Sequence, residues 1–183
     1  EVIALAKQGA GKVSMGNSGI GTSAHVGMEL LQRMAGVEFT HVPYKGIPPA
    51  LVDLVSGQLQ LLCTSPAQVM GQIREGKVKP IVVTGAKRMT HLPNVATVQE
   101  SGIPGYEANA WIGMVVHSAT PPEIVAKLNR EIASILQVPE LKSRLMNDGS
   151  EVVGSTPEQF AAHVRSELDK WSKVIKSAGI KPQ

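Results

Sequence analysis

A glycine-rich turn between a strand-like run and a helix-like run constrains this chain more than any other feature. The turn reads GNSGIGTSAH over residues 16–25. Polar and apolar side chains alternate over residues 12–15, and apolar residues recur at helical spacing over residues 26–34. Glycines allow a sharp turn, and a helix start offers unpaired N–H donors and a partial positive charge. The pattern therefore predicts a strand, a turn and a helix that together seat a phosphate or a carboxylate.

Two catalytic motifs with similar glycines do not fit this turn. Gly16 and Gly21 have the spacing of a P-loop, but Thr22 stands where that motif needs the lysine that pairs with nucleotide phosphates. A nucleophile elbow around Ser18 needs a glycine two residues later, and that position is Ile20. Each motif therefore fails at one residue, which counts against a nucleotide-dependent enzyme and against acyl transfer.

A dinucleotide fingerprint fits the glycines better but lacks its acidic partner. Gly19, Gly21 and Ala24 match the spacing of that motif. The acidic residue should close the next strand, whereas Glu38 precedes the strand expected over residues 39–42. A turn without any ligand also stays open at this point, because helix starts are rich in Ser, Thr and Gly for capping reasons.

Strand-like and helix-like runs alternate along most of the chain. This alternation predicts a mainly parallel α/β architecture. From residue 85 to 108 the pattern loosens, and this segment is the best candidate for a linker. We expect strands over 13–16, 39–42, 59–63, 78–84, 110–117 and 151–153, and helices over 22–35, 49–56, 65–75, from 121, over 139–147 and from 157. The sequences SPAQ at 65–68, TPPE at 120–123 and TPEQ at 156–159 predict capping boxes, and TVQE at 97–100 is a candidate cap for one short helical turn.

Composition excludes several classes of function. The net charge is +3 without a block of lysine or arginine, and six residues are aromatic, so no platform for nucleic acid is expected. No apolar run is long enough to span a bilayer. Cys63 is the single cysteine, which excludes an internal disulfide. The chain begins at Glu1 in what resembles the middle of a helix, so we expect that an upstream segment is missing.

The ends of the first three predicted strands carry the candidate ligand-binding residues. Parallel strands end at the same edge of their sheet, and α/β proteins bind ligands there. The residues of the second loop could instead form a plain surface turn without a ligand. Those of the third loop could serve only to cap a helix. The candidates are Ser18, Gly21, Thr22 and Ser23 in the first loop, Tyr44 and Lys45 in the second, and Thr64 and Ser65 in the third.

The same loops are poor in the groups that transfer protons or hold metals. The five histidines show no metal-ligand spacing, and most carboxylates lie on the predicted solvated faces of helices. The sequence therefore predicts the binding of an anion, with no catalytic residue, no metal and no cofactor.

Several motifs in order along the chain resemble one receptor family. The chain resembles the periplasmic solute receptors of tripartite tricarboxylate transporters, the Bug-type receptors. The resemblance covers essentially the whole chain, and its combination of motifs is far more specific than one glycine loop. It is carried by GNSGIGTSAH at 16–25, HVPYKG at 41–46, PALVDLVSGQ at 49–58, VTGAKR at 83–88, LPNVATV at 92–98, GIPGYE at 102–107, AWIG at 110–113 and TPEQF at 156–160.

The resemblance implies an α/β fold of the periplasmic binding protein type, a type II Venus flytrap with two lobes. Residues 1–105 would form the second ligand-binding lobe with a return hinge, and residues 106–183 the C-terminal part of the first lobe. One lobe would be nearly complete and the other partial. It also implies a periplasmic, non-enzymatic receptor that hands a small di- or tricarboxylate to membrane transporter subunits.

Two positions qualify what the resemblance implies about the ligand. Many relatives carry an acidic residue or Asn after the third strand, whereas this chain has Cys63, Thr64 and Ser65. This departure weakens the case for amino-acid ligands, whose ammonium group needs an acid. Trp111 follows the hinge, so it is expected either in the cleft between the lobes or in the core of the first lobe.

Two other functions and one physical property stay open at this point. The runner-up is a phosphate- or nucleotide-binding α/β enzyme that uses residues 16–22, and a module without any ligand is the third reading. A partial lobe would leave apolar helix faces uncovered. We therefore expect the chain by itself to pair with a second copy, as a homodimer, or to be only partly ordered after Ala110.

Overall fold

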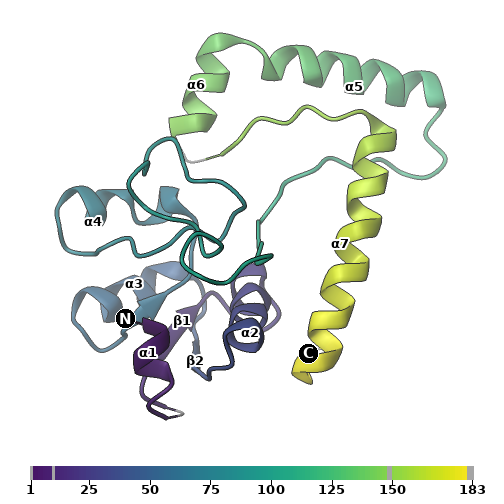
Figure 1. Ribbon diagram of the computed structural model, residues 1–183. Coiled ribbons are helices and arrows are strands. Elements are labelled where there is room, and N and C mark those ends of the chain that lie inside the picture. The colour runs from purple at the N-terminus through teal and green to yellow at the C-terminus, as the bar shows by residue number, and fades with distance from the viewer. Residues whose placement is uncertain (1, 10, 148–149, 181–183) are drawn as a thin grey trace. The chain divides into compact units, whose positions relative to one another are not determined.

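The computed structural model describes residues 2–9, 11–147 and 150–180. The chain divides into two compact units, and each is described by itself (Figure 1). The first comprises Glu1–Ala110 and Lys173–Gln183, and the second comprises Trp111–Ser172. The elements are α1 (Val2–Ala6), β1 (Ser14–Asn17), α2 (Ser23–Ala35), β2 (Thr40–Pro43), α3 (Ile47–Val55), β3 (Leu61–Leu62), a 3₁₀ turn (Pro66–Gln68), α4 (Met70–Arg74), α5 (Pro122–Leu136), α6 (Pro139–Asn147) and α7 (Pro157–Ala178).

A parallel three-stranded sheet organises the first unit. Its strand order is β2-β1-β3, so β1 is central and the predicted parallel architecture is confirmed. Met15 pairs with His41 on one side and with Leu61 on the other. Because both partners are parallel to β1, the three strands end at one edge of the sheet.

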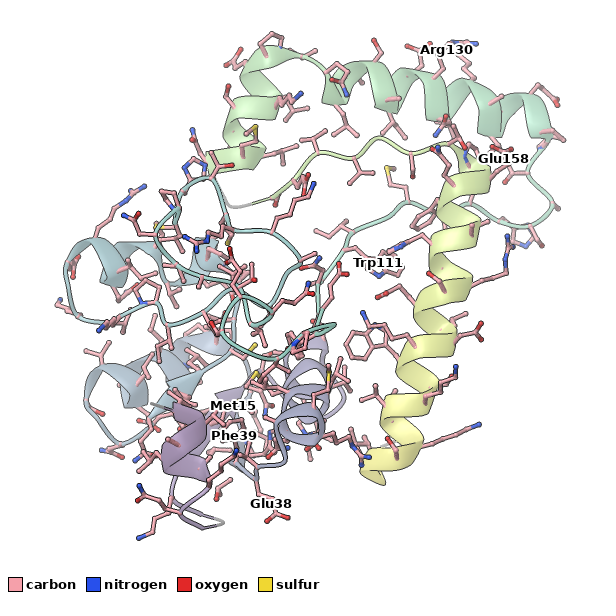
Figure 2. The ribbon with its side chains drawn as sticks, viewed as in Figure 1. Met15, Glu38, Phe39, Trp111, Arg130 and Glu158 are labelled. Carbon is pink, nitrogen blue, oxygen red and sulfur yellow. The ribbon has the colours of Figure 1, made fainter. Side chains whose placement is uncertain are left out.

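The core of the first unit lies on one face of β1. Val13 and Met15, two residues apart and therefore on the same face, are 1% and 0% exposed. Met28 and Leu31 from α2 pack in the same cluster, and so does Phe39, which lies close to Met15 in Figure 2. The stripe of apolar residues read from the sequence of α2 is therefore the side that is buried.

The opposite face of β1 needs a small residue. A Cβ atom placed on Gly16 would lie 2.5 Å from a methyl carbon of Leu59 and 3.3 Å from the ring of Tyr44. Side chains of Leu59 and Tyr44 therefore cover this face at Gly16, and α3 contacts both β1 and β3. Helix α3 was expected over residues 49–56 but starts at Ile47. Proline is tolerated in the first turn of a helix, because an N–H group there would have no acceptor within the helix.

Two predictions in the middle of the chain are wrong. Ser65 makes no side-chain cap, because the Thr64 hydroxyl bonds the Gln68 side chain that a capping box would use. The helix expected over 65–75 is instead a 3₁₀ turn followed by the short α4. Residues 78–84 form no strand and contribute one isolated bridge between Val83 and Thr97.

The linker-like segment after residue 85 folds back onto the first unit. Thr97 and Glu100 form a reciprocal capping box, with N–H to side-chain distances of 2.8 and 3.1 Å. Arg88 bonds Glu100 at 2.9 Å. The buried Tyr106 hydroxyl donates to the Gly27 carbonyl of α2 at 3.0 Å. These bonds fix the segment as part of the same folded unit.

The second unit consists of helices and extended chain in the residues that the structure describes. Residues 110–117 and 151–153 are not strands, contrary to expectation. Residues 111–117 are all exposed, and Ile112 is 100% exposed. A strand requires a partner for its backbone N–H and C=O groups, and none lies beside this segment in the described residues.

Capping explains where the helices of the second unit begin. Thr156 and Gln159 form the expected box before α7, at 2.9 and 3.3 Å. Pro121 caps α5 without a side-chain bond, so the box expected at 120–123 does not form. The last residues of α7 belong to the first unit. In the described parts of the chain, the helices are too short or too polar to cross a membrane.

Candidate functional site

The three predicted ligand loops leave the sheet at one edge. The Tyr44 N–H donates to the Asn17 carbonyl at 3.0 Å, and the Cys63 N–H donates to the Gly16 carbonyl at 3.3 Å. The loops after β2 and β3 therefore flank the glycine loop that follows β1. Sequence order and strand direction were sufficient to predict this arrangement.

Asn17 and Thr22 shape the glycine loop. The side-chain oxygen of Asn17 accepts the Gly19 N–H at 3.0 Å, and the Thr22 hydroxyl donates to the Gly19 carbonyl at 2.8 Å. Gly19 and Gly21 have φ angles of 133° and 79°, which side-chain-bearing residues rarely adopt. Asn17 is 0% exposed, and its Nδ2 atom has no hydrogen-bond partner among the described residues.

The start of α2 supplies the loop's donors. Thr22 is the N-cap, and its hydroxyl oxygen accepts the His25 N–H at 3.4 Å. The Ser23 and Ala24 N–H groups come before the first internal bond of the helix, so they are the donors that a ligand can meet. The Thr22 hydroxyl is already committed to the turn, which makes the backbone the stronger source of anion-binding groups.

The second loop is held by an aromatic hydroxyl. Tyr44 donates from its hydroxyl to Oδ2 of Asp53 on α3 at 2.8 Å. This hydrogen bond, with the negative charge of Asp53, raises the pKa of Tyr44 above its usual value. The adjacent Lys45 is exposed. The loop thus offers one exposed positive charge beside a phenol whose hydroxyl is already bonded to Asp53.

The third loop is uncharged. Burial raises the pKa of the Cys63 thiol to about 11, so the thiol stays protonated at neutral pH. The Thr64 hydroxyl donates to Oε1 of Gln68 at 2.6 Å. Ser65 is exposed. This loop has hydroxyl and amide groups but no acid that would pair with a ligand's ammonium group.

A buried polar cluster lies directly behind the glycine loop, and sequence spacing did not reveal it. Side-chain nitrogen and oxygen atoms of His25, Glu29 and His41 all lie within 4.8 Å of one another. His41 comes from β2, so only the pairing of β1 with β2 brings it to α2. The one sequence signal was the spacing of His25 and Glu29 by four residues on a helix.

Trp111 lies in the second unit, where it packs on α7. Its ring meets Phe160 and His163 edge to face, with centroids 5.5 and 5.2 Å apart. Its N–H donates to Glu167, which also accepts the Trp171 N–H at 2.7 Å. Burial opposes the charge on Glu167, but these hydrogen bonds prevail and lower its pKa.

The geometry brings together eight of the nine predicted site residues, at the edge where the three strands end. Trp111 belongs to the other unit. Which of these residues contact a ligand stays a prediction, and so does the assignment of residues 1–105 and 106–183 to two lobes.

Comparison with known proteins identifies the family. A model of the tripartite tricarboxylate transporter family receptor matches residues 1–180. The chain spans about half the length of most of the curated relatives it matches, 52% of one that is 35% identical. It covers 61% of a solved Rhodopseudomonas palustris protein, Rpa4515 with adipate, at 36% identity and a TM-score of 0.87.

Two further solved structures agree with this result. The periplasmic binding protein BugD is 32% identical with a TM-score of 0.79, and the chain covers 62% of it. MatC from Rhodopseudomonas palustris, with bound malate, is 31% identical with a TM-score of 0.77; the match covers 95% of this chain and 60% of MatC. The fold is therefore the α/β periplasmic binding protein fold, and its family consists of solute-binding receptors rather than enzymes. The chain belongs to the tripartite tricarboxylate transporter receptor family, as a Bug-type member.

Proposed function

We propose that this protein is a receptor for a small organic di- or tricarboxylate, and that the glycine loop and the start of α2 bind one carboxylate. The observation that carries the proposal is a helix start with two available N–H donors, behind a turn that Asn17 and Thr22 hold in place. Hydrogen bonds from N–H groups to a charged acceptor are stronger than those to a neutral one.

The other loops supply the remaining contacts in this proposal. Ser18, Gly21 and Ser23 border the carboxylate, while Lys45 adds positive charge beside Tyr44. Thr64 and Ser65 offer hydroxyl groups from the third loop. Trp111 of the second unit is 43% exposed and stays a proposed ligand-binding residue.

The neutral third loop favours a ligand without an amino group. A ligand's ammonium group that is desolvated on binding needs an opposite charge nearby, and Cys63, Thr64 and Ser65 do not provide one. Solved relatives hold adipate and malate, which are dicarboxylates without an amino group. The proposed ligand class is therefore di- or tricarboxylates of this kind.

The family also supports a cellular location and a transport partner. We infer that the receptor works in the periplasm and delivers its ligand to the membrane subunits of a tripartite tricarboxylate transporter. The nucleotide-dependent enzyme that the glycines first allowed has no support, because its phosphate-binding lysine is absent and the family is one of receptors.

Calorimetric titration of the full-length receptor tests the proposal. Adipate, malate and citrate are compared with glutamate, inorganic phosphate and ATP. At least one of the amino-free carboxylates should bind, and glutamate, phosphate and ATP should not. Binding of ATP or phosphate alone would overturn the proposal, as would the absence of binding by all three carboxylates.

A pair of variants at the N-cap tests the site itself. Thr22→Val removes both bonds of the hydroxyl and should weaken carboxylate binding by about 1–3 kcal/mol. Thr22→Ser keeps the hydroxyl and should bind nearly as the wild type does. Equal affinity of the valine variant and the wild type would show that the turn is only structural.

A further inference from the structure

The buried His25 holds the glycine loop through one particular nitrogen atom. The Gly21 N–H donates to Nδ1 of His25 at 3.1 Å. His25 is 7% exposed. Because Nδ1 accepts this hydrogen bond with its lone pair, a neutral imidazole must carry its own proton on Nε2. The loop geometry therefore selects one tautomer of a neutral histidine.

The titratable groups around His25 come from three segments. Glu29, on the same helix, places Oε1 3.8 Å from Nε2 of His25 and 2.9 Å from Nε2 of His41. The ring of His41, from β2, meets the His25 ring edge to face with centroids 4.8 Å apart. Tyr106 packs on the same helix, and burial raises its pKa, so it stays neutral.

This cluster is poorly suited to a metal ion although its atoms are close enough. A metal bound to Nε2 of His25 would force the ring's proton onto Nδ1. The proton would then face the Gly21 N–H, and the bond between them would be lost. Nε2 of His41 is also 3.0 Å from the Gln32 amide nitrogen, which occupies space that an ion would need. The arrangement is better suited to holding or releasing a proton.

We propose that His25 is a positioning residue of the ligand loop, and that it holds the loop only while its imidazole is neutral. Protonation puts a hydrogen on Nδ1, which then repels the Gly21 N–H instead of accepting from it. Gly21 lies one residue before the N-cap, so its release loosens the turn that presents the Ser23 and Ala24 donors.

His41 and Glu29 decide where an added proton goes. Burial and the neighbouring His25 lower the pKa of His41, although the carboxylate of Glu29 opposes this. Two adjacent imidazolium ions would repel each other in a buried site, so the cluster favours one positive charge at a time. The carboxylate of Glu29 then forms an ion pair with whichever ring carries that charge.

The consequence for function rests on the proposed carboxylate site. A loosened loop should bind a carboxylate less tightly, so affinity should fall as pH drops through the range in which histidines gain charge, about pH 8 to pH 5. The ligand's own protonation changes in the same range. A variant that keeps the acceptor but cannot titrate is therefore the necessary control.

Amide spectroscopy of the full-length receptor without ligand tests the positioning role. In the wild type, the chemical shift of the Gly21 amide should follow the protonation of His25. In His25→Asn, whose side-chain oxygen can replace Nδ1 as acceptor, that shift should not change over the same range. In His25→Leu the Gly21 amide should exchange with solvent roughly two- to tenfold faster. His41→Asn is the matched comparison, because His41 does not contact Gly21. In this variant the Gly21 amide should still respond to pH, but at a different pH from the wild type, since the His41 ring lies beside the His25 ring.

Adipate titration of the same proteins separates this inference from the proposed function. Between about pH 8 and pH 5.5 the wild type should lose roughly two- to tenfold more affinity than His25→Asn does. A pH-independent Gly21 amide in the wild type, or the same pH response in His25→Asn, would overturn the inference. A Gly21 amide that follows His25 without any carboxylate binding would instead overturn the proposed function and leave the positioning role intact.

Discussion

The two units of the chain differ in whether they enclose a core. In the first, residues such as Val13, Met15 and Tyr106 are almost completely buried. In the second, the described residues of Trp111–Ser172 are all exposed or only partly buried. Yet α5 and α7 carry apolar stripes and capping signals as good as those of α2. The difference teaches that an amphipathic helix becomes part of a core only where another sheet or helix is present to pack against its apolar face.

Self-association of the chain would be the largest effect of this difference. Ile112, Met114 and Val115 are 100%, 72% and 85% exposed, which is unusual for neighbouring large apolar residues. We expect residues 1–183 by themselves to pair with a second copy or to be only partly ordered after Ala110. Analytical ultracentrifugation and hydrogen exchange check this. A compact monomer with one cooperative melt would contradict it.

A charge introduced into this exposed segment sharpens the expectation. Val115→Asp should weaken the pairing, because burying a carboxylate in an apolar contact is unfavourable. Val52→Asp is the matched control, since Val52 is 67% exposed in the first unit and should leave the association unchanged. An equal effect of both variants would place the contact elsewhere.

Replacing one large apolar side chain by alanine should lower the free energy of unfolding much more in the first unit than in the second. Met15→Ala removes a fully buried side chain and should cost about 2–5 kcal/mol, from lost burial and the cavity left behind. Leu168→Ala, at a residue 65% exposed, should cost no more than about 0.5 kcal/mol. Urea unfolding of each variant measures both free-energy costs. Similar costs would mean that the second unit has a core after all.

Cores and caps differ in how well the sequence predicts them. The parallel sheet followed from alternation, and the boxes at Thr97 and Thr156 followed from four-residue patterns, because those interactions are local. The expected strand at 110–117 did not form, since a strand depends on a neighbour that local sequence does not reveal.

The candidate site was likewise predictable only where its contacts are local in sequence. Strand ends located the three loops, but the partners of their side chains came from distant positions. Tyr44 bonds Asp53 on α3, and His41 reaches the helix that carries His25. These contacts depend on how the helices pack on the sheet, so spacing along the chain could not predict them.

The capping boxes at Thr97 and Thr156 test the same difference between the units, with smaller expected effects on stability. Thr97→Ala should cost about 1 kcal/mol of global stability, because Thr97 is buried in the first unit and its box is tied to Arg88. Thr156→Ala should leave global unfolding unchanged and speed amide exchange only in the first turn of α7. Equal shifts in the unfolding midpoint would show that the two units unfold together.

Thiol reactivity should show the smallest and most local difference. With its pKa raised to about 11, Cys63 should react with iodoacetamide at about pH 8 at least tenfold more slowly than an exposed thiol, and faster as pH rises toward that pKa. A cysteine introduced at the exposed Ser166, in a Cys63→Ser background, is the comparison. Rapid modification of Cys63 at that pH would contradict its burial beside the core.

The most direct test of the account is to map adipate binding onto the backbone of the full-length receptor. The start of α2 in the first unit should carry the site, so the amides of Ser23 and Ala24 should shift most in proton–nitrogen spectra and gain protection from exchange. Shifts that saturate with adipate but leave Gly19, Gly21, Ser23 and Ala24 unchanged would contradict the account.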